Sequence, residues 1–156
     1  CLRVATYNIL LDAFCDTDWA RENLYPYCAP VFAKLSYRLQ LLLTELSGYF
    51  ADLVCLQEVG RSAFNALVAA GAVVGLEGLF GERPHGRGGW GLAILFRGSC
   101  MRLLSQRIID LSRMEQYWLE HPLVAPLCRQ DKSLAARLAT THTIAQVASF
   151  DTVADF

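Results

Sequence analysis

The fold is best approached from the stretch Ala51-Asp52-Leu53-Val54-Cys55-Leu56-Gln57-Glu58-Val59. Its apolar centre is short, which is typical of a buried strand, and we expect the strand to end at Glu58. A carboxylate at a strand's end is held rigidly and still reaches solvent. Because Mg²⁺ commonly takes only one or two protein carboxylates and fills its other positions with water and substrate phosphate, Glu58 is a candidate metal ligand.

A second candidate lies near the beginning of the chain. Residues 3–9 alternate in the manner of a strand that ends at Asn8. The neutral amide of Asn8 is suited to hold a phosphate oxygen or a metal-bound water without adding negative charge. The competing interpretation of both Asn8 and Glu58 is an ordinary turn or surface residue at a strand end, and spacing alone leaves that open.

Helical patterns connect these strands. Residues 12–33 form a polar and aromatic connection with two prolines, in which we expect one short helix. From residue 34 to residue 47 the leucines recur at i, i+4, i+7, i+8 and i+11, which predicts one apolar helix face, with Gly48 as its C-terminal cap. A second helix is predicted over residues 61–70.

The second half of the chain is predicted to be richer in strands. Residues 90–97 form an apolar strand, and residues 101–110 are expected to be its hairpin neighbour. A capping box that starts at Ser112 predicts a helix towards Glu120, and residues 143–150 predict a last strand. This order indicates a layered mixed α/β domain rather than a doubly wound parallel sheet.

Composition excludes several classes of protein. The chain has 156 residues, 54% of them hydrophobic and 19% charged, with a net charge of −1. It is therefore one core-forming domain, neither disordered nor polybasic, and its apolar runs are too short to span a bilayer. Six cysteines lack CxxC or zinc-finger spacing, which favours reduced, structural thiols in an intracellular compartment.

Three further features of the sequence bear on function. A G-x-G-x-x-G pattern at residues 86–91 is followed by a strand instead of a helix, so we interpret it as a hairpin loop rather than a dinucleotide site. His85 and His121 each adjoin a proline and resemble loop residues, and His142 precedes the last predicted strand instead of ending one. All three are left outside the site. Residues 83–113 hold six arginines and one acid, so part of this set either contacts phosphates or lies on a solvated sheet edge.

Several segments together resemble one family. They are Tyr7-Asn8-Ile9-Leu10, Tyr25-Pro26-Tyr27-Cys28-Ala29-Pro30, Tyr37-Arg38 and residues 51–59. In this order they resemble the opening half of the endonuclease/exonuclease/phosphatase superfamily, and most closely its mitochondrial 2′-phosphodiesterase branch. That branch is related to the cytoplasmic poly(A) deadenylases and to nocturnin. The resemblance runs from about residue 3 to residue 107.

The resemblance implies a four-layer α-β-β-α sandwich and a phosphodiesterase that depends on Mg²⁺, with Mn²⁺ as an alternative metal. Glu58 matches the family's metal-binding glutamate, and Asn8 matches the asparagine beside the metal and the scissile phosphate. Arg97 is carried as a substrate-binding candidate. The expected reaction is in-line attack of water on adenylate-rich RNA, either 2′,5′-oligoadenylate or poly(A), with release of AMP from the free end.

The sequence also departs from the family. Trp90 stands where an acidic residue is expected, and the later Asn-Thr-His, Gly-Asp-Phe-Asn and Ser-Asp-His motifs are missing. We therefore expect residues 1–156 to be the N-terminal part of one catalytic domain, incomplete at the C-terminus and inactive in isolation. The resemblance implies the mitochondrial matrix as location, with the cytoplasm as alternative.

Two alternatives to the RNA-hydrolysing enzyme stay open. The first is a non-catalytic, truncated or diverged relative that acts by binding. The second is a nocturnin-like phosphatase that acts on a phosphorylated nucleotide and releases inorganic phosphate instead of AMP.

Overall fold

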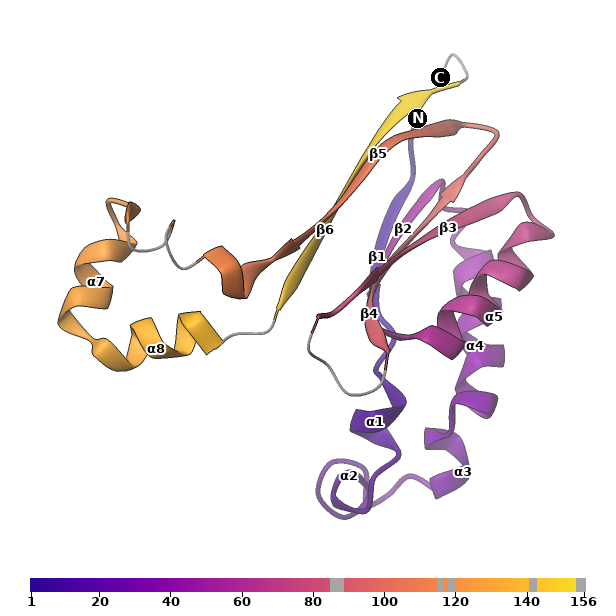
Figure 1. Ribbon diagram of the computed structural model, residues 1–156. Coiled ribbons are helices and arrows are strands. Elements are labelled where there is room, and N and C mark those ends of the chain that lie inside the picture. Colours follow the sequence, from indigo (N-terminus) through magenta and orange to yellow (C-terminus); the bar gives the residue numbers. More distant parts are fainter. Residues whose placement is uncertain (85–88, 115–116, 118–119, 141–142, 154–156) are drawn as a thin grey trace.

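A four-stranded sheet forms the centre of the molecule. The computed structural model describes all residues except 85–88, 115–116, 118–119, 141–142 and 154–156 (Figure 1). The strands are β1 (Val4–Asn8), β2 (Leu53–Gly60), β3 (Leu76–Glu82) and β4 (Trp90–Arg97), and they lie in the order β1-β2-β4-β3. Strands β1 and β2 are parallel, whereas β4 is antiparallel to both β2 and β3.

Two helices cover one face of this sheet (Figure 1). They are α4 (Leu35–Gly48), which follows the leucine periodicity and lies one residue later than predicted, and α5 (Arg61–Ala72), which extends two residues beyond its predicted end. Gly48 is the last helical residue rather than the cap. The left-handed residue after the helix is Phe50, with φ 49°.

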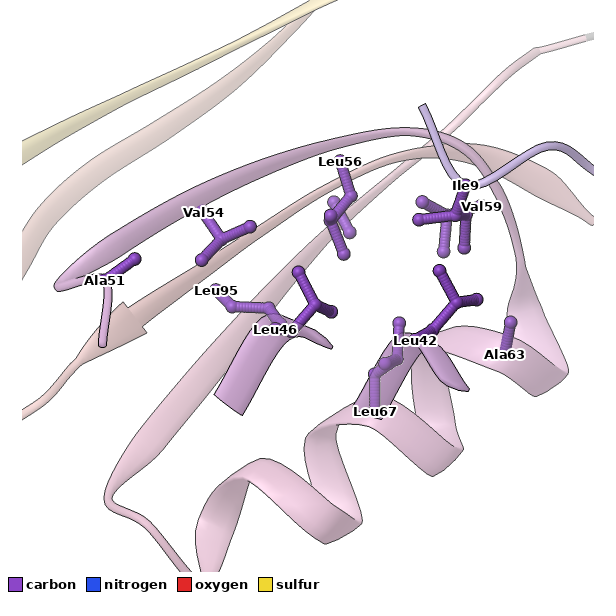
Figure 2. Packing of buried hydrophobic residues seen from close by; sticks show 11 residues of the cluster. Ile9, Leu42, Leu46, Ala51, Val54, Leu56, Val59, Ala63, Leu67 and Leu95 are labelled. Atoms are coloured by element: carbon purple, nitrogen blue, oxygen red, sulfur yellow. The ribbon is translucent and has the colours of Figure 1, made fainter. Parts of the chain in front are cut away.

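The main core lies between these helices and the sheet. Val54, Leu56 and Val59 of β2 are almost fully buried there and face Leu42 and Leu67 of the two helices (Figure 2). Strand β2 alternates towards this core, and β4 is buried at four successive positions. The prediction of a buried strand over residues 52–57 is therefore confirmed, with β2 running from Leu53 to Gly60. Glu58 lies on this strand between the core residues Leu56 and Val59.

A second, two-stranded sheet lies on the opposite side of the first one. It pairs β5 (Met101–Asp110) with β6 (Ile144–Thr152) in antiparallel fashion. Phe96 of β4 meets Phe150 of β6 with ring centroids 4.9 Å apart. The prediction that residues 101–110 pair with residues 90–97 is therefore wrong, because β2 and β3 already occupy both edges of β4 and the chain must turn into another layer.

Strand β3 was not predicted, because its sequence contains two glycines and two glutamates. It forms a hairpin with β4, which confirms the hairpin interpretation of the glycine-rich connection; residues 85–88 of that connection lie outside the described residues. A Cβ atom on Gly91 would lie 1.9 Å from the carbonyl oxygen of Gly81. The close approach of these two strands therefore requires glycine at position 91.

The remaining segments are short helices. Residues 12–33 form α1 (Asp12–Cys15), α2 (Asp18–Asn23) and α3 (Pro30–Ala33), three helices where one was expected. A 3₁₀ helix, η1 (Leu111–Met114), begins the region predicted to be helical from Ser112; the rest of that prediction falls partly outside the described residues.

Helices α7 (Val124–Gln130) and α8 (Lys132–Thr140) project beyond one end of the β5–β6 ribbon (Figure 1). In the part of the chain that the structure describes, no helix is long and apolar enough to cross a membrane.

Candidate functional site

Asn8 and Glu58 come together at one end of the parallel pair β1–β2. The side-chain amide of Asn8 donates a hydrogen bond of 2.9 Å to Oε1 of Glu58. Asn8 is the last residue of β1 and lies opposite Gln57 in the register, so its neighbour across the sheet edge is the segment that carries Glu58. The structure thus brings together the two residues that the sequence singled out separately.

The backbone at Glu58 is unusual. Strand β2 continues to Gly60 instead of ending at Glu58, but its register with β4 shifts between Leu56 and Val59, and Glu58 itself has φ 56°. A left-handed conformation costs a residue other than glycine on the order of 1–3 kcal/mol and is concentrated at functional sites. The irregularity lifts Glu58 out of the alternation, so that Val59 enters the core while Glu58 stays half-buried.

The loop after β1 closes around the same carboxylate. The backbone N–H of Leu11 donates to Oε2 of Glu58 at 3.3 Å, and the N–H of Leu10 donates to Oδ1 of Asn8 at 2.9 Å. Leu10 has φ 58°, a second left-handed residue within this small region. Each oxygen of Glu58 therefore accepts one hydrogen bond, and the orientation of the carboxylate is fixed from two sides.

Arg38 of α4 anchors this loop from below. Its guanidinium donates to the carbonyl of Ile9 at 2.7 Å, to the carbonyl of Ala33 at 2.9 Å, and to the carboxylate of Asp12. The Arg38 side chain is 17% exposed, so these charge-assisted bonds are shielded from water. The function of the Tyr37-Arg38 motif is in this respect structural: it ties α3, α4 and the strand end into one unit.

A cavity of about 540 Å³ opens beside the pair. Glu58 and Gly60 of β2 form part of its wall, and the other lining residues come from the segment after β1 with the start of α1, the first residue of α4, the first turns of α5 and the start of β4. Among them are Leu10, Asp12, Arg61, Asn65 and Trp90. A volume of this size is typical of sites for small molecules or single nucleotides.

The donor set fits a hard cation with few protein ligands. Within the described residues, no three His, Cys, Asp or Glu side chains gather as a metal-binding cluster. Two of the described cavity residues are carboxylates, Asp12 and Glu58; Asp12 pairs with Arg38, whereas Glu58 faces the neutral amide of Asn8 and is the carboxylate that could serve a cation. Mg²⁺ accepts this arrangement because it retains several waters, whereas structural zinc demands four protein ligands.

Arg97 is not brought to this pair. It ends β4 at the opposite end of the sheet, where its side chain donates to the carbonyl of Val74 at 3.0 Å and to Oδ1 of Asp52 at 3.3 Å. The backbone N–H of Arg3 also donates to Asp52, at 2.9 Å. This N–H and the Arg97 guanidinium lower the pKa of the Asp52 carboxyl. The Arg97 side chain thus ties the end of β4 to the residues that precede β2 and β3.

The other arginines of residues 83–113 are spread over the molecule. Arg102 pairs with Asp151 at 2.8 Å and Arg113 pairs with Asp110 at 3.4 Å, both with largely exposed guanidinium groups. Arg87 lies outside the described residues. Arg83 stacks on Trp90, with its guanidinium carbon 4.7 Å from the ring centroid. Of the described arginines in this set, only Arg83 thus contacts a residue of the cavity wall.

Two cavity residues escaped prediction as site residues. Arg61 appeared only as a helix start, and in the structure it pairs with Glu82 at 2.5 Å while covering the ring of Phe80. Trp90 appeared only as a departure from a family pattern. The signal for Arg61 was its position three residues after Glu58, where a helix start returns to the same sheet edge.

The structure places the six cysteines apart, each as a free thiol. Burial raises the pKa of the Cys55 thiol, as expected for a small, half-buried apolar residue in a strand. His121 lies by α7, away from the cavity, whereas His85 and His142 are outside the described residues.

Relatives of the chain give this geometry a context. A segment of 110 residues is 49% identical to 2′,5′-phosphodiesterase 12 of Mus musculus and covers 70% of this chain but 17% of that protein. A segment of 66 residues is 46% identical to Carbon catabolite repressor protein 4 homolog 2 of Arabidopsis thaliana, over 42% of this chain and 10% of that protein.

Solved structures agree on the fold. ANGEL2, a 2′,3′-cyclic phosphatase, in complex with adenosine-2′,3′-vanadate superposes with a TM-score of 0.70 at 22% identity, over 97% of this chain and 37% of that one. The human nocturnin catalytic domain superposes with a TM-score of 0.53 at 26% identity, over 70% of this chain and 37% of that one. The predicted α/β sandwich class is confirmed by these matches.

Residues 5–103 match the Endonuclease/Exonuclease/phosphatase family, a range that runs from β1 through the first residues of β5 and includes Asn8, Glu58 and the cavity beside them. The chain belongs to the endonuclease/exonuclease/phosphatase family.

Proposed function

We propose that this chain contributes the Mg²⁺-binding half of a phosphodiesterase that shortens adenylate-rich RNA from its free end and releases AMP. The observation that carries the proposal is the Asn8–Glu58 pair, joined at 2.9 Å, in which Glu58 lies on the wall of a cavity large enough for a nucleotide. Mn²⁺ is the alternative metal.

Glu58 would hold the cation, and Asn8 would position it. The two hydrogen bonds from Asn8 and Leu11 fix both carboxylate oxygens, so no side-chain rotation is needed when a cation binds. The Oδ1 atom of Asn8 is held by the Leu10 N–H, which leaves the amide in one orientation. When bound, the metal supplies charge stabilisation to the phosphoryl oxygens in the transition state.

Adenylate-rich RNA is proposed because of the relatives. One is called a 2′,5′-phosphodiesterase, and another, from Schizosaccharomyces pombe, a 3′-5′-exoribonuclease subunit of the CCR4-Not complex. The first name denotes hydrolysis of a 2′,5′-phosphodiester, and the second denotes removal of nucleotides from RNA in the 3′-to-5′ direction. The matched part is 17% of the length of the first relative, so activity, substrate and a mitochondrial location are proposals for the protein that carries this chain.

The experiment compares hydrolysis of 2′,5′- and 3′,5′-oligoadenylate by that protein with Mg²⁺, with Mn²⁺ and with a chelator. We expect AMP as product, and a loss on the order of 10²-fold or more in Glu58→Gln, which keeps the size of the side chain but not its charge. The matched control is Glu22→Gln, an exposed glutamate of α2. Undiminished turnover in Glu58→Gln would overturn the site.

The product separates the alternatives. A nucleotide phosphatase is the second candidate, favoured by the name of ANGEL2 as a 2′,3′-cyclic phosphatase, and it would release inorganic phosphate from a phosphorylated nucleotide assayed beside the oligoadenylates. No product from any substrate with either metal, together with retained oligoadenylate binding, would favour a binding protein. The same assay on the isolated 156-residue chain tests the expected inactivity of that part.

A further inference from the structure

We propose that the cavity beside Glu58 is a nucleoside subsite in which the base stacks on Trp90. This inference rests on the proposed function, since it assigns one nucleotide of the RNA to a defined place in the site. It goes beyond that function because it names a residue, Trp90, that selects for the base rather than for the phosphate.

The position of Trp90 relative to Glu58 is fixed by the sheet. Trp90 begins β4 and lies opposite Gly60, two residues after Glu58. The backbone on both sides is hydrogen-bonded: Arg61 N–H donates to the carbonyl of Gly89 at 2.8 Å, and Arg83 N–H donates to the carbonyl of Trp90 at 3.0 Å. The ring is therefore carried by a rigid strand start, not by a free loop.

The ring itself is also fastened. Phe14 of α1 meets it edge-on with centroids 5.5 Å apart, and the guanidinium of Arg83 lies 4.7 Å from its centroid. Trp90 lines both the large cavity and a hollow of about 80 Å³ that Arg83 also lines. Because the ring is half-buried and held by two neighbours, it loses little conformational freedom when a base stacks on it.

Arg83 adds an uncommitted positive charge. Among the described residues its guanidinium makes no ion pair, and its Nε atom is buried without a hydrogen-bond partner. By contrast, Arg61 on the other wall is paired with Glu82. Arg83 lines the small hollow rather than the large cavity, so it acts through the ring: a cation that stacks on the indole adds positive charge beside it and favours a stacked, negatively charged nucleotide.

The lining suits a nucleoside better than an apolar ligand. Leu10, Leu11 and Leu35 provide an apolar wall, while Ser62 and Asn65 of α5 provide hydrogen-bonding groups for a ribose or a base edge. Glu58 belongs to the same wall, so a phosphate at the proposed metal would leave its own nucleoside within reach of Trp90. A purine covers more of the indole than a pyrimidine, which favours adenylate.

The test measures binding, with no hydrolysis involved. AMP and ribose 5-phosphate are titrated into the 156-residue chain by calorimetry in the presence of Mg²⁺. We expect AMP to bind about 10-fold more tightly, since stacking contributes at this level per base. Trp90→Leu should remove this ratio while the affinity for ribose 5-phosphate stays unchanged, and Trp90→Phe should retain part of it. The matched control is Trp19→Leu, because Trp19 is 63% exposed on α2 and outside the cavity.

The outcomes separate this inference from the proposed function. An unchanged ratio in Trp90→Leu overturns the subsite, whatever the hydrolysis assay of Glu58→Gln shows. A lost ratio supports the subsite even where no RNA is hydrolysed. If circular dichroism shows Trp90→Leu to be unfolded, transfer of saturation from indole protons to the base of AMP decides in the double variant Trp19→Leu/Trp118→Leu, in which Trp90 is the one remaining tryptophan. Persistence of the signal supports the subsite, and its absence overturns it.

Discussion

The amide of Asn8 and the carboxylate of Glu58 lie in direct contact at 2.9 Å although 50 positions separate them in the chain. The contact exists because β1 and β2 are parallel neighbours, so that the carboxyl ends of both strands meet at one sheet edge. A neutral donor, not a cation, faces Glu58, and the carboxylate therefore keeps its negative charge available to a metal ion.

Asn8→Asp should make the melting temperature of the chain depend more strongly on Mg²⁺. The substitution places two carboxylates within hydrogen-bonding distance, so repulsion should lower the melting temperature of the metal-free chain. Addition of Mg²⁺ should raise the melting temperature of Asn8→Asp by more than that of the wild type. Thermal unfolding at a range of Mg²⁺ concentrations measures both effects, and equal shifts in the two proteins would contradict the metal assignment.

Arg38→Lys should destabilise the fold clearly. Lysine keeps the charge but cannot reach the carbonyls of Ile9 and Ala33 and the carboxylate of Asp12 at once, so the free energy of unfolding should fall by about 2 kcal/mol. Arg102→Lys is the control: its guanidinium is 69% exposed, and we expect a loss below about 1 kcal/mol. Urea denaturation compares the two, and equal losses would refute the anchoring role.

Asp52→Asn should lower the stability of the fold at neutral pH, and by less in acid. The N–H of Arg3 and the Arg97 guanidinium lower the pKa of Asp52 in the folded chain, so its contribution to stability is complete above the unfolded value near 3.8 and vanishes as pH falls through the folded value. The difference in urea midpoint between wild type and Asp52→Asn should therefore shrink from pH 7 towards pH 3. Asp18→Asn, whose side chain is 90% exposed, should show little difference at any pH.

Gly91→Ala should separate strands β3 and β4. The added methyl group would lie 1.9 Å from the carbonyl oxygen of Gly81, a backbone atom that cannot swing away, and we expect a loss of about 3 kcal/mol. Gly48→Ala is the counterpart, since no atom lies within 4 Å of its added Cβ, and helix propensity favours alanine by up to about 1 kcal/mol. Chemical denaturation of both variants should give changes of opposite sign.

Some of the fold could be predicted because local pattern and tertiary environment agree. Helix α4 and strand β4 have the predicted positions, since an apolar stripe and an apolar run each have one favourable way to be buried. Strand β3 could not be predicted in this way. Its two glycines and two glutamates carry no strand signal, and it exists because β4 offers it a complete set of backbone partners.

The candidate site, too, has residues that local sequence could indicate and others that it could not. Asn8 and Glu58 were found from strand ends and from motifs, but their contact depends on the order of the strands, which local sequence does not specify. Because β4 runs antiparallel to β2, its first residue, Trp90, lies beside the last residue of β2 and lines the cavity. Arg97 ends β4 and therefore lies beside the beginning of β2, far from Glu58.

The separation of Asn8 and Glu58 also has a kinetic consequence. The β3–β4 hairpin closes through a short connection, residues 83–89, and its loop-closure entropy is small. Pairing of β1 with β2 must instead close a loop of about fifty residues, which includes α1 to α4, before any hydrogen bond between these two strands can form. During refolding the β3–β4 hairpin should therefore form before the hydrogen bond between Asn8 and Glu58. Cation binding should develop at the same rate as the slowest phase of refolding.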